Sequence, residues 1–316
     1  MRIIFMGTPD FAVPSLQALI DAGHEIVLVV TQPDKPKGRG NKMAMPPVKE
    51  LALTYEIPVY QPEKVKNDAF VDTLKSYEAD LMITVAYGKI LSEAALKATP
   101  LGCINVHASL LPRYRGSAPL WWVIINGEEK TGISTMYTDV GMDTGDIIDV
   151  AEFPIPEDMT VGELSDQMAD LGAKTLLVTL EKLEQGTLKR TPQEDALATY
   201  APMIEKQLGE INWANMSREI HNLVRGTNPW PVAYTFYEEQ RMRIFSTDFR
   251  VDYKLAEMGK EEPGTILKVD DTGIWVATGD GVLLVKEVQV DSGKRMWVKE
   301  YIRGHQVKVG TVLGAK

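Results

Sequence analysis

The sequence predicts an α/β protein in which an open, mostly parallel sheet flanked by helices is followed by a small, OB-like β-barrel. Three observations lead to this prediction. The first stretch of roughly 200 residues alternates short runs rich in Ile and Val with amphipathic segments, as expected of strands joined by crossover helices. The last stretch of roughly 100 residues carries short, closely spaced strands separated by turns rich in Gly and Asp. The length of 316 residues allows two domains.

The amino-terminal pattern begins with an apolar run and ends with a long amphipathic segment. Apolar runs of the kind that parallel strands show predict strands at 2–7, 25–31, 80–87, 102–107 and 132–140. Helical spacing of apolar residues is found at 11–23, 47–56, 68–77 and 160–186. This order predicts a sheet with helices on both faces.

A polar segment without sustained periodicity separates the two patterns. The predicted domains are therefore 1–188 and 208–316, with a linker at 189–207. The second domain is expected to open with a short helix at 210–226. Its strands are expected at 233–239, 242–251, 264–270, 273–280 and 281–290.

The composition, with 44% hydrophobic and 25% charged residues, is that of an ordinary globular protein. No apolar run reaches the ~18–20 residues that a membrane span needs, and the first residues lack the features of a signal peptide. Cys103 is the only cysteine, which excludes an intramolecular disulfide and leaves a structural zinc site without a thiol pair. We therefore expect a cytoplasmic protein without a metal.

The net charge of −10 is carried by the amino-terminal part, because residues 201–316 hold 16 basic and 16 acidic residues. Within that acidic part, the segment 31–49 has five basic residues and one Asp. A basic segment on an acidic domain favours a local site for a polyanion over general attraction to nucleic acid. A solvated loop with no ligand is the alternative.

Several familiar ligand motifs are incomplete. Gly7 ends the first expected strand, but the second and third glycines of a dinucleotide fingerprint are missing, and no Walker A motif is present. The acidic segment 138–146 resembles a calcium loop only superficially, since Gly141 takes the third ligand position and Val150 the twelfth. The sequence thus disfavours nicotinamide, ATP and calcium sites.

The stretch NVHASLLPRYRG, directly after an expected strand, holds the best candidates for catalysis. Asn105 and His107 are two residues apart, so on a strand they face the same side at a separation of ~6.6–7 Å. They lie at the carboxyl end of the strand, where open α/β sheets bind ligands. An amide donor beside an imidazole suits a tetrahedral intermediate that bears an oxyanion. One of the three Asp of the loop 139–146 could hold the imidazole.

Taken together, these motifs resemble those of the folate-dependent formyltransferases. The resemblance covers almost the whole chain, through FMGTPDFAVPSL, TQPDKPKGRGNK, VAYGKIL, NVHASLLPRYRGSAP, DVGMDTGDI, NPWPVAY and VATGDGVLLV. It implies a Rossmann-like catalytic domain, an OB-like tRNA-binding domain, and transfer of a formyl group from 10-formyltetrahydrofolate to an amine. The full set of motifs implies that the amine is the α-amino group of initiator methionyl-tRNA. No metal is implied, and a monomer is expected.

The resemblance also implies roles for particular residues. Asn105 and a protonated His107 would stabilise the oxyanion, and Asp143 would pair with His107. The folate would contact Tyr87, Ile90, Leu91, Ser109, Leu110, Leu111, Pro112, Asp139 and Val140. The tRNA would contact the basic segment through Lys35, Lys37, Arg39 and Lys42. Arg113 and Arg115 are expected mainly as solvent-facing residues, and Trp230 as a packing anchor.

Three alternatives remain. A formyltransferase for a small amine would share the three catalytic residues but would need neither the second domain nor the basic segment. A non-catalytic tRNA- or folate-binding protein would tolerate His107→Ala and Asp143→Asn. A serine hydrolase using Ser109 and His107 is disfavoured, because two residues so close on one strand are poorly placed for attack.

Overall fold

The computed structural model describes residues 1–37, 42–250 and 261–314. The chain divides into two compact units. The amino-terminal unit consists of Met1–Pro119, Lys130–Pro154 and Ser165–Pro202, and the carboxy-terminal unit of Leu120–Glu129, Ile155–Leu164 and Met203–Lys316. No helix in these described parts combines the length and the apolar character that crossing a bilayer requires.

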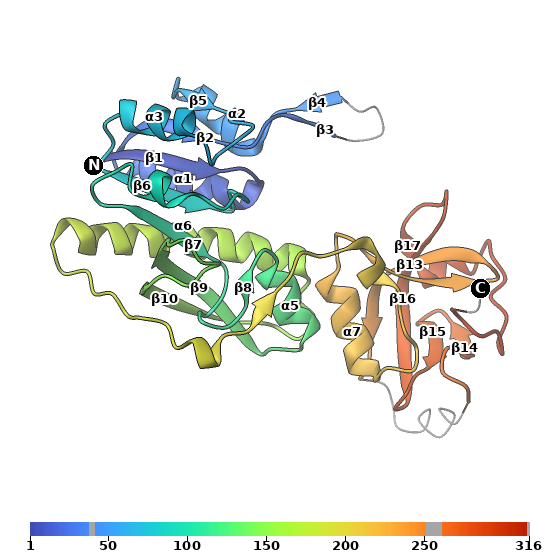
Figure 1. Ribbon diagram of the computed structural model, residues 1–316. Helices are drawn as coiled ribbons and strands as arrows, with labels where there is room; N and C mark the ends of the chain where they lie inside the picture. Colours follow the sequence, from blue (N-terminus) through green and yellow to red (C-terminus); the bar gives the residue numbers. More distant parts are fainter. Residues whose placement is uncertain (38–41, 251–260, 315–316) are drawn as a thin grey trace. The chain divides into compact units, whose positions relative to one another are not determined.

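A mixed sheet, most of whose strands are parallel, forms the centre of the amino-terminal unit (Figure 1). Its order is β10 (Ile147–Pro154), β9 (Lys130–Tyr137), β7 (Cys103–His107), β6 (Leu81–Val85), β1 (Arg2–Gly7), β2 (Glu25–Val30) and β5 (Val59–Tyr60). The strands from β7 to β5 are parallel, whereas β9 and β10 run antiparallel to their neighbours. The predicted mostly parallel sheet is therefore confirmed.

Helices connect the strands of this unit. They are α1 (Val13–Asp21), preceded by the 3-10 turn η1 (Asp10–Ala12), α2 (Pro47–Thr54), α3 (Asp68–Ser76), α4 (Glu93–Leu96) and α6 (Val161–Glu184). One face of the sheet packs against α3 and α4 in a core that includes Met82 and Cys103. The opposite face lies against α6, where Gly172 allows close approach, since a Cβ there would lie 3.1 Å from Val106.

The edge strand β10 is absent from the sequence prediction for a physical reason. None of its residues is buried: the first three are half-buried, and the rest alternate between exposed and half-buried. It therefore lacks the buried, uninterrupted apolar run that marks a central strand. Its neighbour β9 ends at Tyr137, three residues before the predicted strand end, and the following residues form a loop. A short hairpin of β3 (Lys35–Lys37) and β4 (Lys42–Ala44) extends away from the body of this unit (Figure 1).

The carboxy-terminal unit is built on an antiparallel sheet. Its order is β12 (Ala233–Tyr237), β13 (Gln240–Asp248), β16 (Val282–Val290), β15 (Gly273–Ala277) and β14 (Ile266–Asp270), with β17 (Met296–Trp297) paired to β16. Helix α7 (Ser217–Gly226) and the one-turn helix α9 (Val298–Tyr301) contribute buried residues to its apolar core. Among the described residues no ladder joins β12 to β14, so the antiparallel sheet is found and closure into a barrel stays a prediction.

The helix expected at 210–226 forms only from Ser217 onward. Upstream of it, the amide of Ile211 donates to the carbonyl of Tyr234, and the indole of Trp213 donates to the hydroxyl of Thr235 at 2.9 Å. These residues therefore lie along β12 rather than in a helix. Helix α5 (Pro119–Ile125), the short strands β8 (Arg115–Gly116) and β11 (Tyr200–Ala201), and the 3-10 turns η2 (Asp195–Leu197) and η3 (Lys206–Gly209) complete the fold.

Candidate active site

The carboxyl end of β7 carries two polar side chains on one face of the sheet. Asn105 stands opposite Thr84 in the register of β7 and β6, and its Oδ1 accepts a hydrogen bond from the Thr84 hydroxyl at 2.8 Å. Because alternate residues of a strand share a face, His107 points to the same side as Asn105. With Oδ1 engaged by Thr84, the amide NH2 of Asn105 is the group that can donate to a ligand.

His107 is 6% exposed, and both of its ring nitrogens face protein groups. Its Nε2 lies 2.9 Å from the carbonyl oxygen of Tyr114, and since a carbonyl only accepts, Nε2 carries the proton. Its Nδ1 lies 3.7 Å from Oδ2 of Asp143. In the neutral ring, Nδ1 is thus the unprotonated nitrogen, and it faces a carboxylate.

Asp143 is held in an unusual backbone conformation. Its φ of +54° lies in the left-handed region, which costs a non-glycine residue about 1–2 kcal/mol. The same Oδ2 that faces His107 accepts a hydrogen bond from the amide of Gly116 at 2.7 Å. Gly116 itself has a φ of +120°, and a Cβ there would lie 2.7 Å from the carbonyl oxygen of Ala201, so this donor position favours glycine.

The three Asp of the loop 139–146 have different surroundings. Asp139 accepts from the amide of Gly141 at 3.0 Å and from the hydroxyl of Thr144 at 2.6 Å, so it shapes the loop from within. Asp146 pairs with Arg190, on the segment that follows α6, at 2.9 Å. Only Asp143 of the three has a carboxylate facing His107 in the ion pairs of the described residues.

The SLLP segment is fixed from β9. The hydroxyl of Ser134 donates to the carbonyl of Ser109 at 2.7 Å and accepts from the amide of Leu111 at 3.1 Å. The Ser109 hydroxyl is fully buried and donates to the carbonyl of Arg113 at 2.7 Å, which is the geometry of a structural residue rather than a nucleophile. Leu111 is buried and joined to Pro112 by a cis peptide bond, while Leu110 and Pro112 are half-buried.

The segment after β6, Tyr87–Leu91, holds further residues of the predicted folate site. Tyr87 and Leu91 are buried. In contrast, Ile90 is 57% exposed, and Val140 in the acidic loop is 64% exposed. Burial raises the pKa of the Tyr87 phenol to about 12, so it stays neutral. The side-chain amide of Gln32 donates to the carbonyl of Tyr87 at 3.0 Å, which ties this segment to the end of β2.

The basic segment has an ordered base. Lys35 and Lys42 are exposed on the hairpin, the backbone of Lys37 pairs with that of Lys42, and Arg39 lies outside the described residues. At the foot of the hairpin, the ammonium group of Lys49 donates to both carboxylate oxygens of Asp34 at 2.9 Å. The amide of Gln61 donates to the same carboxylate at 2.7 Å, and these hydrogen bonds lower the pKa of Asp34. Asp34 therefore stays ionised and anchors the hairpin.

Two residues near Asp143, Arg115 and Gln193, were not predicted as residues of the site. Arg115 was expected mainly as a solvent-facing residue, but it is 2% exposed. Its guanidinium donates to Oε1 of Gln193, whose Nε2 in turn donates to the carbonyl of Asp143 at 2.8 Å. Gln193 falls within the polar segment predicted as a linker, where no periodicity marks a role. No pattern in the sequence therefore marks Gln193 as part of the site.

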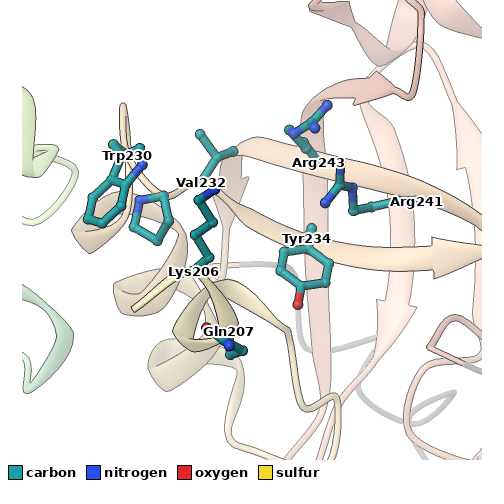
Figure 2. Close-up of a pocket in the computed structure, with 8 residues that line it drawn as sticks. Lys206, Gln207, Trp230, Val232, Tyr234, Arg241 and Arg243 are labelled. Carbon is teal, nitrogen blue, oxygen red and sulfur yellow. The ribbon is translucent and has the colours of Figure 1, made fainter. Parts of the chain in front are cut away.

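The carboxy-terminal unit has a cavity of about 280 Å³ with a basic and aromatic lining (Figure 2). It is lined by Lys206, Gln207, Trp230, Pro231, Val232, Tyr234, Arg241 and Arg243. Trp230 is 47% exposed, so the expected packing anchor presents much of its ring to solvent. Figure 2 shows this ring on one side of the cavity and the two guanidinium groups on the other. Such a lining suits the phosphates and bases of a nucleic acid.

The protein has two domains, and its similarity to known proteins shows it to be a group-transfer enzyme. A family model described as formyl transferase matches residues 1–180, and one described as formyl transferase, C-terminal domain, matches residues 203–306. The chain belongs to the formyl transferase family.

The curated relatives match along the entire chain. A methionyl-tRNA formyltransferase of Acetivibrio thermocellus is 56% identical over 314 residues, which cover 99% of this chain and 100% of the relative. The protein of the same name from Clostridioides difficile is 52% identical, with the same coverage of both chains. Identity at this level over both domains shows that the protein is a formyltransferase.

Solved structures share the fold at lower identity. WlaRD, a sugar 3N-formyl transferase, superposes with a TM-score of 0.65 at 19% identity, covering 90% of this chain and 97% of the other. HypX from Aquifex aeolicus, solved in complex with tetrahydrofolic acid, gives a TM-score of 0.61 at 18% identity over 98% of this chain and 50% of that chain. These two matches support the fold alone.

Proposed function

We propose that this protein transfers the formyl group of 10-formyltetrahydrofolate to the α-amino group of methionine carried by initiator tRNA. The observation that carries the proposal is identity of 56% to a methionyl-tRNA formyltransferase over both domains. The cluster of Asn105, His107 and Asp143 supplies the chemistry that this reaction needs. Membership of the formyl transferase family supports folate as the formyl carrier.

The proposed reaction is direct attack by the amine. Its nitrogen forms a bond to the formyl carbon, and the carbonyl oxygen becomes an oxyanion in a tetrahedral intermediate. The NH2 of Asn105, oriented because Thr84 occupies the amide oxygen, donates to this oxyanion. The positive charge of protonated His107 stabilises it further, and Asp143 stabilises that charge across the 3.7 Å separation.

The second half of the reaction needs a proton on the leaving nitrogen. Protonated His107 gives the proton on Nδ1 to the nitrogen of the folate. The ring, now neutral, takes up the proton that the positively charged amine loses, directly or through a water. The bond between the folate nitrogen and the formyl carbon then breaks, and tetrahydrofolate leaves with the proton. The reaction needs no covalent enzyme intermediate. This is consistent with the Ser109 hydroxyl, which donates its proton to the carbonyl of Arg113.

We assign the folate to the walls formed by Tyr87–Leu91, Ser109–Pro112 and the loop that carries Asp139 and Val140. The tetrahydrofolate ring would lie against backbone and apolar side chains such as Leu91 and Leu111, which are buried. This assignment puts the formyl donor beside the carboxyl end of β7, which is where open α/β sheets hold their ligands.

The tRNA would contact both units. We assign the hairpin residues Lys35, Lys37 and Lys42, with Arg39 between them, to the phosphates of the acceptor end. The cavity lined by Lys206, Trp230 and Arg241 would hold another part of the tRNA, and the antiparallel sheet around it would be an OB-like domain. In this assignment residues 1–188 are catalytic and 208–316 bind tRNA. A cytoplasmic monomer suffices for the reaction.

Mass spectrometry of the acceptor tests the proposal. The protein is incubated with 10-formyltetrahydrofolate and either methionyl initiator tRNA or a panel of small amines, including amino sugars linked to nucleotides. We expect a mass gain of one formyl group on methionyl-tRNA alone. Formylation of a small amine with unmodified methionyl-tRNA would contradict the proposed acceptor, and no formylation of either would contradict the proposed reaction.

A further inference from the structure

The segment after α6 makes a precise set of contacts with the loop that carries Asp143. The side-chain amide of Gln193 donates to two carbonyl oxygens of that loop, those of Asp143 at 2.8 Å and Gly145 at 2.7 Å. These carbonyls belong to the residues on either side of Thr144, shortly before β10 begins at Ile147. A single NH2 group thus joins two points of the loop and fixes its curvature next to the carboxylate.

The other end of the same amide is fixed by a buried cation. Oε1 of Gln193 accepts two hydrogen bonds from Arg115, from Nε at 3.0 Å and from Nη2 at 2.9 Å. Arg115 is 2% exposed, and its Nη2 also pairs with Asp195, which is 83% exposed. The guanidinium sets which way the amide points, because only Oε1 can accept its protons.

The backbone around Arg115 closes the arrangement. Its amide donates to the carbonyl of Thr199 at 2.8 Å, and β8 pairs in parallel with β11. The next amide, that of Gly116, donates to Oδ2 of Asp143 at 2.7 Å. Two hydrogen bonds therefore fix Asp143. The amide of Gly116 binds its carboxylate, and the side chain of Gln193 binds its backbone carbonyl, while the backbone adopts the left-handed conformation.

We propose that Gln193 is a positioning residue for Asp143 and that the buried Arg115 orients Gln193 for this purpose. The inference rests on the proposed function, since it assigns these residues to the same transfer reaction. The polar segment after α6 then has a role beyond connecting the two domains: it sets the distance between Asp143 and His107. Neither residue is assigned a contact with substrate.

Gln193→Glu separates the two halves of this contact. The new carboxylate still accepts from Arg115, but it cannot donate to the carbonyls of Asp143 and Gly145 and repels them. A displacement of the order of 1 Å at a catalytic group costs about 10- to 100-fold in rate. We expect kcat to fall by that factor, with KM for both substrates within about two-fold. Gln185→Glu, an exposed residue at the end of α6, is the matched control and should leave kcat unchanged.

A double-mutant cycle separates positioning from general weakening of the fold. If Gln193 acts through Asp143, Gln193→Glu has little further effect on kcat in the Asp143→Asn background. Multiplicative losses in the double variant, or a folded Gln193→Glu with kcat within two-fold of the native value, would overturn the inference. In contrast, a native protein that does not formylate methionyl-tRNA at all would overturn the proposed function.

Hydrogen exchange tests the inference without turnover, and does so even for a poorly active variant. The readout is the amide of Gly116, whose acceptor is Asp143, with the amide of Val106 in β7 as an internal reference. We expect Gln193→Glu to speed exchange at Gly116 at least ten-fold and to leave Val106 unchanged. Unchanged exchange at Gly116 would overturn the inference, and Gln193→Leu repeats the test where the Glu variant folds poorly.

Discussion

Oδ2 of Asp143 lies 3.7 Å from Nδ1 of His107 and 2.7 Å from the amide nitrogen of Gly116. One carboxylate oxygen thus faces the imidazole of His107, while a backbone donor fixes the position of that oxygen. The other ring nitrogen of His107 donates to the carbonyl of Tyr114, so the ring cannot turn away without losing this bond. The arrangement orients the imidazole before any substrate binds, which is the condition for efficient proton transfer and charge stabilisation.

Replacing Asn105 by Ala removes the donor assigned to the oxyanion. We expect kcat to fall by about 10²–10³, as for the loss of one oxyanion-hole donor, with little change in KM. Steady-state kinetics with methionyl-tRNA measure this loss.

The orientation of the Asn105 amide is tested separately by Thr84→Val, which keeps the shape of a buried side chain but removes the hydroxyl donor. A loss of about ten-fold in kcat is expected, because the amide can then turn away from the productive orientation. Thr84→Ser, which restores a hydroxyl, should recover most of the rate. Equal rates for the Val variant and the native enzyme would contradict the orienting role.

Replacing Asp143 by Asn keeps an acceptor for the Gly116 amide but removes the negative charge beside His107. The folded state should persist, since the loop keeps its hydrogen bonds from Gln193. We expect turnover to fall by at least about 10²-fold, because the protonated imidazole loses its stabilising partner. Circular dichroism checks the fold, and single-turnover formylation checks the rate. Turnover close to native in a folded Asp143→Asn protein would remove Asp143 from the mechanism.

The basic cavity of the carboxy-terminal unit predicts a salt-dependent loss of tRNA binding. Arg241→Gln combined with Arg243→Gln removes two cations, each of which also pairs with Asp291. If both contact phosphates, the slope of log K against log salt should become shallower by about 1–2, and KM for tRNA should rise while KM for folate stays constant. Filter binding over a salt series measures the slope. The exposed Arg295→Gln, which pairs with Glu287, is a control outside the cavity.

His221 predicts how the stability of the carboxy-terminal unit changes with pH. Burial lowers its pKa, and the charges of Arg225 and Arg250 act in the same direction, whereas the Glu157 carbonyl and the charge of Asp158 oppose the shift. The unfolded chain takes up a proton near pH 6.5 while the folded one resists it. The free energy of unfolding therefore falls as pH drops below about 6.5, by at most ~1.4 kcal/mol per pH unit from this group.

His221→Gln should flatten this dependence. Denaturant unfolding of native and variant proteins at pH 7.5 and 5.5 compares the two changes in free energy. A native protein that loses no more stability than the variant over this interval would show that His221 accepts its proton equally well in both states.

The sequence pattern predicts the central strands well because β1, β2, β6 and β7 are buried on both faces and read as uninterrupted apolar runs. The edge strand β10 is half exposed and gives no such signal. In the carboxy-terminal unit the strands were found, but a hydrophobic pattern does not state whether the first and last strands pair, so closure could not be settled from it.

The sequence indicates which residues share a strand, but it gives no sign of contacts made between distant segments. Asn105 and His107 share a strand, so their spacing alone places them on one face. Gln193 acts from 50 residues away through backbone carbonyls, whose acceptance of a hydrogen bond depends on the loop conformation and leaves no residue pattern. Arg115 was expected mainly at the surface because arginine is seldom fully buried unless it is paired, and its partners become visible only in the fold.

In the proposed reaction, His107, held by Asp143, carries formyl transfer to methionyl-tRNA. Single-turnover formylation with saturating folate and excess enzyme isolates the chemical step for native protein, His107→Asn and His305→Asn, an exposed histidine of the other unit. We expect His107→Asn to bind both substrates with native affinity but to form formylmethionyl-tRNA at least about 10²-fold more slowly. His305→Asn should match the native protein in both respects. A folded His107→Asn protein that transfers the formyl group at the native rate would contradict this role of His107.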